Sequence, residues 1–176
     1  GTTNFAHQVD LFAISIAFAV KGRVQVGIVL NPISEELYTG VKGQGAHLNG
    51  RPIMISKTSA ISESLLVTGF AYNLGAELPT ALPRFINCLQ AAQGVRRLGS
   101  AALDLCFVAC GRFDGFWEQG LNAWDTAAGD LIAQEAGAKV TDYEGALFEV
   151  NKKEILATNG HIHAALLQMM QIEEMP

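Results

Sequence analysis

The chain has 176 residues, of which 49% are apolar, and its 17 acidic and 12 basic side chains give a formal net charge of −5. A chain of this length can bury a substantial core, and no run of apolar residues reaches the 18 or so needed to cross a bilayer. The acidic balance argues against a broad nucleic-acid-binding surface, because phosphate contacts depend on clustered lysine and arginine.

The chain contains three cysteines and four histidines, and neither set shows the spacing of a metal site. An odd number of cysteines without a close pair is typical of a reduced cytosolic protein, so we expect a cytoplasmic location. We predict that the cysteines are small apolar core residues and that the histidines are structural or lie at the surface. The residues concerned are Cys88, Cys106, Cys110, His7, His47, His161 and His163.

The first third of the chain shows the alternation of side chains that is expected of β-strands. Residues 11–20 place bulky apolar side chains on one side and small side chains on the other. Lys21-Gly22 and Asn49-Gly50 are typical of hairpin turns, and Asn31-Pro32 ends an apolar run. The predicted strands are residues 11–20, 24–28, 37–39, 46–48 and 52–55, which form an antiparallel meander over residues 9–56.

The bulky side of this meander must be covered, because a strand buries its apolar face against another element. The few residues before position 9 cannot provide that cover. We therefore expect covering helices to lie upstream of Gly1.

Beyond residue 58 the signals for strands and helices alternate, which is typical of an α/β layered sheet. Thr80 and Ser100 are predicted helix N-caps, with a loop over residues 75–79 before the first of these helices. The predicted helices are residues 80–93, 100–110, 124–136 and 161–170, and the predicted strands are residues 61–68, 95–98, 113–118, 139–141 and 154–157. The change of pattern predicts two domains: the remainder of an N-terminal sheet domain over residues 1–58, and an α/β domain over residues 59–176.

Gly1-Thr2-Thr3 opens the chain with backbone N–H groups and hydroxyls, a combination suited to binding an anion. The alternative is the trimmed start of an ordinary strand. Short motifs of this kind do not decide the question alone.

Asp125 stands at the start of a predicted helix, where the helix dipole favours a carboxylate. It is interpreted either as the N-cap of that helix or as a ligand of a hard cation. In the second case the small residues Ala127, Ala128 and Gly129 would let the helix start approach a ligand closely.

Two further positions have a structural and a functional interpretation. Gly99-Ser100 opens a helix whose free N–H groups point towards a neighbour, or in which Ser100 is an ordinary cap. Glu118 ends a strand, where it is solvated or accepts a hydrogen bond from a sugar hydroxyl.

Four separated motifs occur along the chain in one order. They are Gly-Thr-Thr-Asn-Phe-x-His at residues 1–7, Gly-x-Gly-Ala-x-x-Asn-Gly at residues 43–50, Gly-Ser-Ala-Ala-Leu-Asp at residues 99–104 and Trp-Asp-x-Ala-Ala-Gly at residues 124–129. Together they resemble the inositol monophosphatase family of the metal-dependent, lithium-sensitive phosphatase superfamily, over essentially the whole chain. Within this family, the sequence is most similar to those of bacterial members.

The resemblance implies a layered αβαβα sandwich, here without its N-terminal helices, and a homodimer. It implies Mg²⁺-dependent hydrolysis of phosphate monoesters, with inositol 1-monophosphate as the expected substrate. By resemblance, Thr2 orients the attacking water, Asp125 is a metal ligand and Glu118 binds a substrate hydroxyl. The substrate contacts that the resemblance implies are Gly1, Thr2, Gly99, Ser100, Ala101, Glu118 and Asp125.

The family's first motif reads Asp-Pro-Ile/Leu-Asp-Gly-Thr, and this sequence begins at its glycine. The two acids of that motif and an earlier glutamate therefore do not occur in the sequence. One carboxylate cannot hold the several Mg²⁺ ions of such a site beside a phosphate. We expect these 176 residues alone to be inactive and the full-length protein to be active.

The alternatives concern the substrate and the role. Relatives in the superfamily cleave fructose bisphosphate, adenosine bisphosphate or histidinol phosphate, and a bacterial relative is a partner in transcription antitermination. The chain could also be a catalytically silent fragment. We expect a small phosphorylated polyol or sugar as ligand, no membrane association and no direct nucleic-acid binding.

Overall fold

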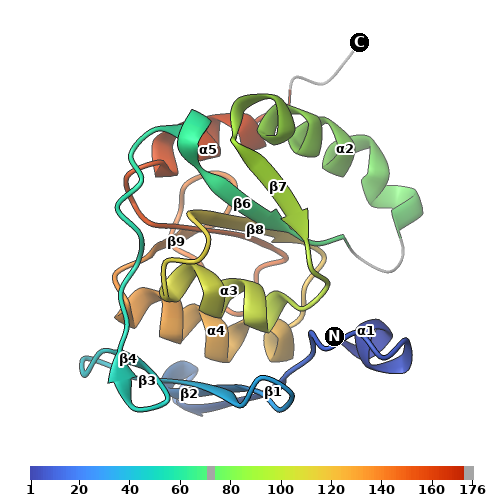
Figure 1. Cartoon of the computed structure of the whole chain (residues 1–176). Coiled ribbons are helices and arrows are strands. Elements are labelled where there is room, and N and C mark those ends of the chain that lie inside the picture. Colours follow the sequence, from blue (N-terminus) through green and yellow to red (C-terminus); the bar gives the residue numbers. More distant parts are fainter. Residues whose placement is uncertain (71–73, 173–176) are drawn as a thin grey trace.

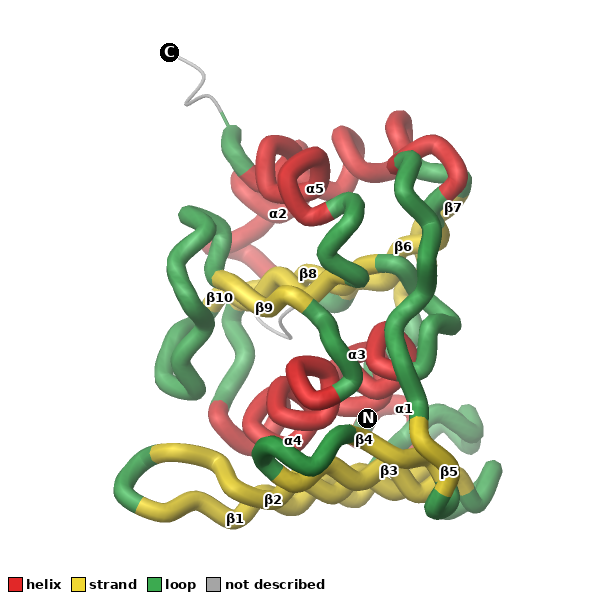
Figure 2. The backbone as a smooth tube through the Cα atoms, turned by 90° about the vertical axis from the view of Figure 1, so that its left-hand side faces the viewer, coloured by secondary structure: helices red, strands yellow, loops and turns green. Residues whose placement is uncertain are grey.

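The computed structural model describes residues 1–70 and 74–172, which form four stacked layers (Figure 1). An antiparallel sheet lies at the bottom of the view, followed by a pair of helices, a mixed sheet and a second pair of helices. Figure 2 shows the same order of layers from the side. The arrangement confirms the predicted α/β layered class.

The bottom layer, sheet A, contains five antiparallel strands in chain order. They are β1 (Ile14–Val20), β2 (Arg23–Asn31), β3 (Glu36–Val41), β4 (Ala46–Leu48) and β5 (Arg51–Pro52). The predicted meander is therefore confirmed. In both predicted hairpin turns, Lys21-Gly22 and Asn49-Gly50, the two central residues have positive φ angles, as a type I′ turn requires.

The last predicted strand of the meander, residues 52–55, is mostly wrong. The backbone N–H of Ile53 still donates to the carbonyl of Ala46, but that of Ile55 donates to the carbonyl of Ala136, far along the chain. The chain leaves the sheet here because its backbone finds partners in another layer.

The second sheet, sheet B, has the strand order β7-β6-β8-β10-β9. Strand β6 pairs in parallel with β7 and β8, whereas β10 pairs antiparallel with β8 and β9. The strands are β6 (Leu65–Thr68), β7 (Gly94–Arg97), β8 (Gly115–Gln119), β9 (Lys139–Thr141) and β10 (Glu154–Thr158). The predicted strand over residues 61–68 is correct only from Leu65, since a 3₁₀ turn, η1 (Ile61–Glu63), precedes it.

The long helices fill two layers. Helices α3 (Ala101–Ala109) and α4 (Ala123–Glu135) lie between the sheets, and α2 (Leu74–Ala91) and α5 (His163–Met170) cover the far face of sheet B (Figure 1). A short helix, α1 (Thr2–Ala6), precedes sheet A, so the interpretation of these residues as a strand is wrong. None of the helices in residues 1–70 and 74–172 combines the length and apolar character that a bilayer crossing requires.

The predicted loop over residues 75–79 is wrong, because these residues belong to α2. The Thr80 hydroxyl is not a cap: it donates back to the carbonyl of Glu77 at 3.0 Å. Pro79 and Pro83 lie inside the helix, where each lacks an amide donor. Packing of α2 against α5 and β7 outweighs these local preferences.

The core consists of two apolar clusters, one on each side of sheet B. The larger surrounds α3 and α4 and joins both sheets, and the smaller lies between sheet B and the pair α2 and α5. Cys88 and Cys106 are buried in them and Cys110 is half-buried, all as free thiols, which confirms two of the predicted core cysteines. The division into two domains at residue 58 stays a prediction.

Strand β1 presents its two faces as the alternation predicts. The small side chains of Ser15, Ala17 and Ala19 are on the side of α4, and the bulky side chains form the outer face of sheet A. Four of these are strongly exposed: Ile14, Ile16, Phe18 and Val20. The expectation of upstream covering helices stays a prediction.

Candidate functional site

The predicted site residues come from separate elements that meet at one side of the molecule. The start of the chain, the starts of α3 and α4 and the carboxyl end of β8 lie close together there (Figure 1). The Asn4 side chain fixes α1 in this place, because its Nδ2 donates to the carbonyls of Leu11 and Leu98, each at 2.7 Å. The loop that contains Gly99 is thus tied directly to the first turn of the chain.

Gly1 and Thr2 begin helix α1, with Gly1 as the N-cap. Both residues are exposed, and the carbonyl of Gly1 accepts from the backbone N–H of Phe5 at 3.0 Å. The first N–H groups of a helix have no partner within the helix, so those of this turn are free to bind a ligand. The anion contacts expected of Gly1 and Thr2 stay a prediction.

Gly99, Ser100 and Ala101 form the entry to helix α3. Gly99 has a φ of +85°, which favours glycine, and its Cα faces the side chains of Arg97 and Asn4. Ser100 is the N-cap by position, but its hydroxyl makes no capping bond. The predicted N-cap position of Ser100 is therefore confirmed, although its side chain does not cap the helix.

Glu118 stands near the carboxyl end of β8 and is only 8% exposed, so its interpretation as a solvated strand end is wrong. Its carboxylate lies directly against Gly69, where a Cβ atom would be 2.1 Å from Oε2. Burial, and then the negative charge of Asp125, raise the pKa of Glu118 to about 8. A desolvated carboxyl group of this kind is suited to exchange hydrogen bonds with a ligand hydroxyl.

Asp125 lies in the first turn of α4, three residues after the N-cap, which is Asn122. The interpretation of Asp125 as the N-cap is therefore wrong. Its Oδ2 nevertheless accepts the backbone N–H of Asn122 at 3.0 Å, which stabilises the helix end.

Two of the small residues after Asp125, Ala128 and Gly129, pack against other elements of the protein. The carbonyl of Ala128 lies so near Gly27 of β2 that a Cβ on this glycine would be 2.6 Å away. Gly129 packs on Leu105 of α3 in the same way. These small residues allow α4 to approach sheet A and α3 closely.

The described residues do not form a metal site by themselves. Within residues 1–70 and 74–172, no group of three or more histidine, cysteine, aspartate or glutamate side chains could hold a metal ion. Asp125 offers one carboxylate, and one of its oxygens already accepts a backbone hydrogen bond. A Mg²⁺ ion prefers six oxygen ligands in near-octahedral geometry, so these residues alone do not fit it.

Sequence reasoning gave no role to Asp104, although it ends the motif at residues 99–104. Its side chain is fully buried in the first turns of α3, and neither carboxylate oxygen has a hydrogen-bond partner within the described residues. Burial raises its pKa well above the usual range, Glu118 adds to this, and Arg97 opposes it. The sequence signal for this buried carboxyl group was an acidic residue within the otherwise apolar run of residues 101–109.

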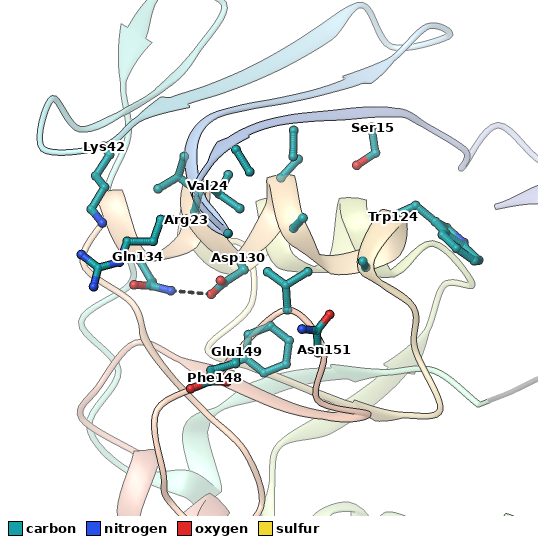
Figure 3. A pocket seen from close by; sticks show the side chains of 18 of the residues that line it. Ser15, Arg23, Val24, Lys42, Trp124, Asp130, Gln134, Phe148, Glu149 and Asn151 are labelled. Atoms are coloured by element: carbon teal, nitrogen blue, oxygen red, sulfur yellow. Dashed lines mark hydrogen bonds between the residues drawn. The ribbon is translucent and has the colours of Figure 1, made fainter.

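A cleft of about 1060 Å³ lies elsewhere, between β1, α4 and the loop at residues 147–151 (Figure 3). Trp124 is in its lining, but neither Asp125 nor Glu118 is. Inside it, Oδ1 of Asp130 accepts the Gln134 side-chain N–H at 2.6 Å, and burial raises the pKa of Asp130 to about 6. The cleft is separate from the cluster of predicted site residues.

The comparison with known sequences gives one family. The sequence profile described as the inositol monophosphatase family matches residues 1–174. An inositol-1-monophosphatase from Synechocystis is 47% identical over 170 residues, which are 97% of this chain and 59% of the relative. A protein from Pseudomonas aeruginosa named Nus factor SuhB is 44% identical over 173 residues, which are 97% of this chain and 64% of that relative.

Solved structures agree with this result. The inositol monophosphatase from Anabaena superposes with a TM-score of 0.93 at 48% identity, covering 97% of this chain and 68% of that one. The inositol monophosphatase from Thermotoga maritima superposes with a TM-score of 0.87 at 32% identity, covering 96% of this chain and 64% of that one. The chain spans about three fifths of the length of the curated relatives that it matches.

Proposed function

Because this chain belongs to the inositol monophosphatase family, we propose that the complete protein hydrolyses phosphate monoesters of small polyols, with inositol 1-phosphate as the substrate. The observation that supports the substrate class is the burial of the Glu118 carboxyl at the end of β8. Such a group pairs well with a ring hydroxyl and poorly with an apolar leaving group.

The chain's own residues have separate tasks in this proposal. The free N–H groups around Gly1 and Thr2 bind the phosphate oxygens, and the Thr2 hydroxyl orients the attacking water. The entry to α3 at Gly99, Ser100 and Ala101 contacts the ring, and Glu118 holds a ring hydroxyl. The product alcohol and inorganic phosphate then leave.

We also propose that the complete protein depends on Mg²⁺, with Asp125 as one ligand that also lies against the substrate. The described residues cannot hold the ion without further acidic ligands, so the 176-residue chain alone is expected to be inactive. Inhibition by lithium, a homodimer and a cytoplasmic location are part of the same proposal.

The test is a substrate panel with the complete polypeptide encoded by the gene. Inositol 1-phosphate should give a higher kcat/KM than fructose bisphosphate, adenosine bisphosphate or histidinol phosphate. Glu118→Gln should raise KM for inositol 1-phosphate and leave hydrolysis of p-nitrophenyl phosphate, which has no ring hydroxyl, nearly unchanged. A stronger preference for another member of the panel would replace inositol phosphate as the substrate.

Asp125→Asn tests the proposed ligand separately. We expect a loss of kcat of roughly 100-fold or more with an unchanged fold, in line with the removal of a group that acts in the transition state. Unchanged turnover would remove Asp125 from the site.

A second role has support from one observation, the name Nus factor SuhB of a relative with 44% identity. We propose that a protein surface of this chain contacts a transcription complex, since its net charge of −5 does not favour direct RNA binding. Co-purification of the complete protein with RNA polymerase, and of its Asp125→Asn variant as well, would support this surface contact. Loss of co-purification upon nuclease treatment would contradict a direct protein contact.

A further inference from the structure

Glu118 faces the site because of the alternation along β8. Phe116 belongs to the core cluster of α3 and α4, whereas Trp117 belongs to that of α2 and α5. Successive side chains of a strand point to opposite faces, so Glu118 is on the side of α3 and α4 and Gln119 on the side of α2. The two neighbours thus link the candidate site to the opposite face of sheet B.

The end of β8 has lost one of its two strand neighbours. Pairing with β6 ends at Thr68 and Trp117, so among the described residues Glu118 and Gln119 pair only with β10, opposite Ile155 and Glu154. A strand end held on one side alone needs another restraint if its side chain is to keep one position.

The Gln119 side chain supplies that restraint through both ends of its amide. Its Oε1 accepts from Nη1 of Arg84 at 2.6 Å, and its Nε2 donates to Oγ1 of Thr80 at 3.2 Å and to Oε2 of Glu77 at 3.4 Å. Both partners of Nε2 lie on α2, Thr80 about one turn and Glu77 about two turns before Arg84. The amide is therefore fixed in one orientation.

Arg84 is itself anchored at three points. Its Nε donates to the carbonyl of Met170 at the end of α5 at 2.8 Å, and its guanidinium lies 4.6 Å from the centre of the Tyr143 ring. With Gln119, these contacts join α2, α5 and β8. A planar, charged guanidinium is suited to such fixed multiple bonding.

We propose that Arg84 is a positioning residue for Glu118, acting through Gln119 on the end of β8. The inference rests on the proposed function, since it assigns to α2 a part in recognition of the polyol ring. On one side, Gly69 leaves room for the carboxyl of Glu118. On the other side, the contact between Arg84 and Gln119 holds the backbone at the end of β8.

The test uses Arg84→Met in the complete polypeptide. We expect KM for inositol 1-phosphate to rise roughly tenfold, in the range of coupling between residues of one network, with kcat nearly unchanged. KM for p-nitrophenyl phosphate should stay the same. Arg84→Lys, which keeps a charged donor, should recover part of the loss, and Gln119→Leu should reproduce it.

The decisive comparison is a double-mutant cycle with Glu118→Gln. If Arg84 acts through Glu118, Arg84→Met should raise KM little further in the Glu118→Gln background. Arg112→Met is the matched control, because Arg112 forms an ion pair with Glu36 at a site apart from these contacts. It should lower the melting temperature without changing KM.

The outcomes separate the two proposals. If the wild-type polypeptide hydrolyses no phosphate monoester, the proposed function fails and this inference fails with it. If the wild type is active but Arg84→Met behaves like Arg112→Met, or its effect adds fully to that of Glu118→Gln, this inference alone is overturned.

Discussion

His163 is a buried histidine that joins strands β9 and β10 to helix α5. Its Nδ1 lies 2.9 Å from the hydroxyl of Thr158 and its Nε2 lies 3.1 Å from that of Thr141. Burial, and to a smaller extent the charge of Lys139, lower the pKa of His163 to about 4. The expectation of a structural role is confirmed for this histidine.

The lowered pKa makes stability depend on pH. The unfolded chain binds a proton near pH 6.5, whereas the folded chain resists it down to about pH 4, so stability falls as the pH drops through this window. We expect a loss of about 2–3 kcal/mol from this group. Urea unfolding at several pH values should show this loss. The free energy of unfolding of His163→Gln should change less with pH between pH 6.5 and 4. If the free energy of unfolding changed equally with pH in the wild type and in His163→Gln, this assignment would be contradicted.

Gly69 illustrates how one missing side chain makes room for a functional group. A Cβ at this position would overlap the carboxyl of Glu118, so Gly69→Ala must displace Glu118. We expect a loss of about 1–3 kcal/mol in the free energy of unfolding, typical of overpacking. In a Glu118→Ala background the same change should cost almost nothing, and a cost of the same size there would place the clash elsewhere.

At the scale of elements, the close approach of α3 and α4 decides where the candidate site forms. Gly129 lies against Leu105, and a Cβ there would be 2.8 Å from the Cβ of Leu105. The two helix starts, and with them Ser100 and Asp125, keep their separation through this contact.

Gly129→Ala is therefore expected to destabilise the chain by about 1–3 kcal/mol, although alanine is the better helix former. Gly75→Ala in α2 is the control, because no atom of the described residues lies within 4 Å of its Cβ position. It should be neutral or stabilising. Urea unfolding of the 176-residue chain measures both, and equal effects would show that the helix contact is not tight.

At the scale of the whole molecule, sheet A leaves an apolar face open. Ile14, Ile16, Phe18 and Val20 of β1 are between 46% and 61% exposed, side by side along one strand. Contiguous apolar surface of this kind is typical of an interaction site.

We expect the 176-residue chain to self-associate with rising concentration for this reason. Replacement of Ile16 and Phe18 by threonine keeps the β propensity and should shift sedimentation towards the monomer. Replacement of the exposed Leu147, which lies outside sheet A, is the control. Association that persists in the double variant would show that another surface is responsible.

The sequence by itself determined the elements whose signals are local. Period-two alternation defined the meander, and two hairpin turns followed from Lys21-Gly22 and Asn49-Gly50. The four ordered motifs identified the family. These features depend on neighbours in the chain, so they can be read without knowledge of the fold.

Only the tertiary structure decided which side chains are desolvated and which merely pack. The Glu118 carboxyl fits only because Gly69, just after the end of β6, has no side chain. Asp104 is buried in α3 without a hydrogen-bond partner among the described residues, and Ala128 and Gly129 pack against β2 and α3. Helix α2 likewise includes Pro79 and Pro83, although local preference disfavours proline inside a helix. Burial and electrostatic environment arise from contacts between residues that are distant in the chain, and local sequence patterns do not contain them.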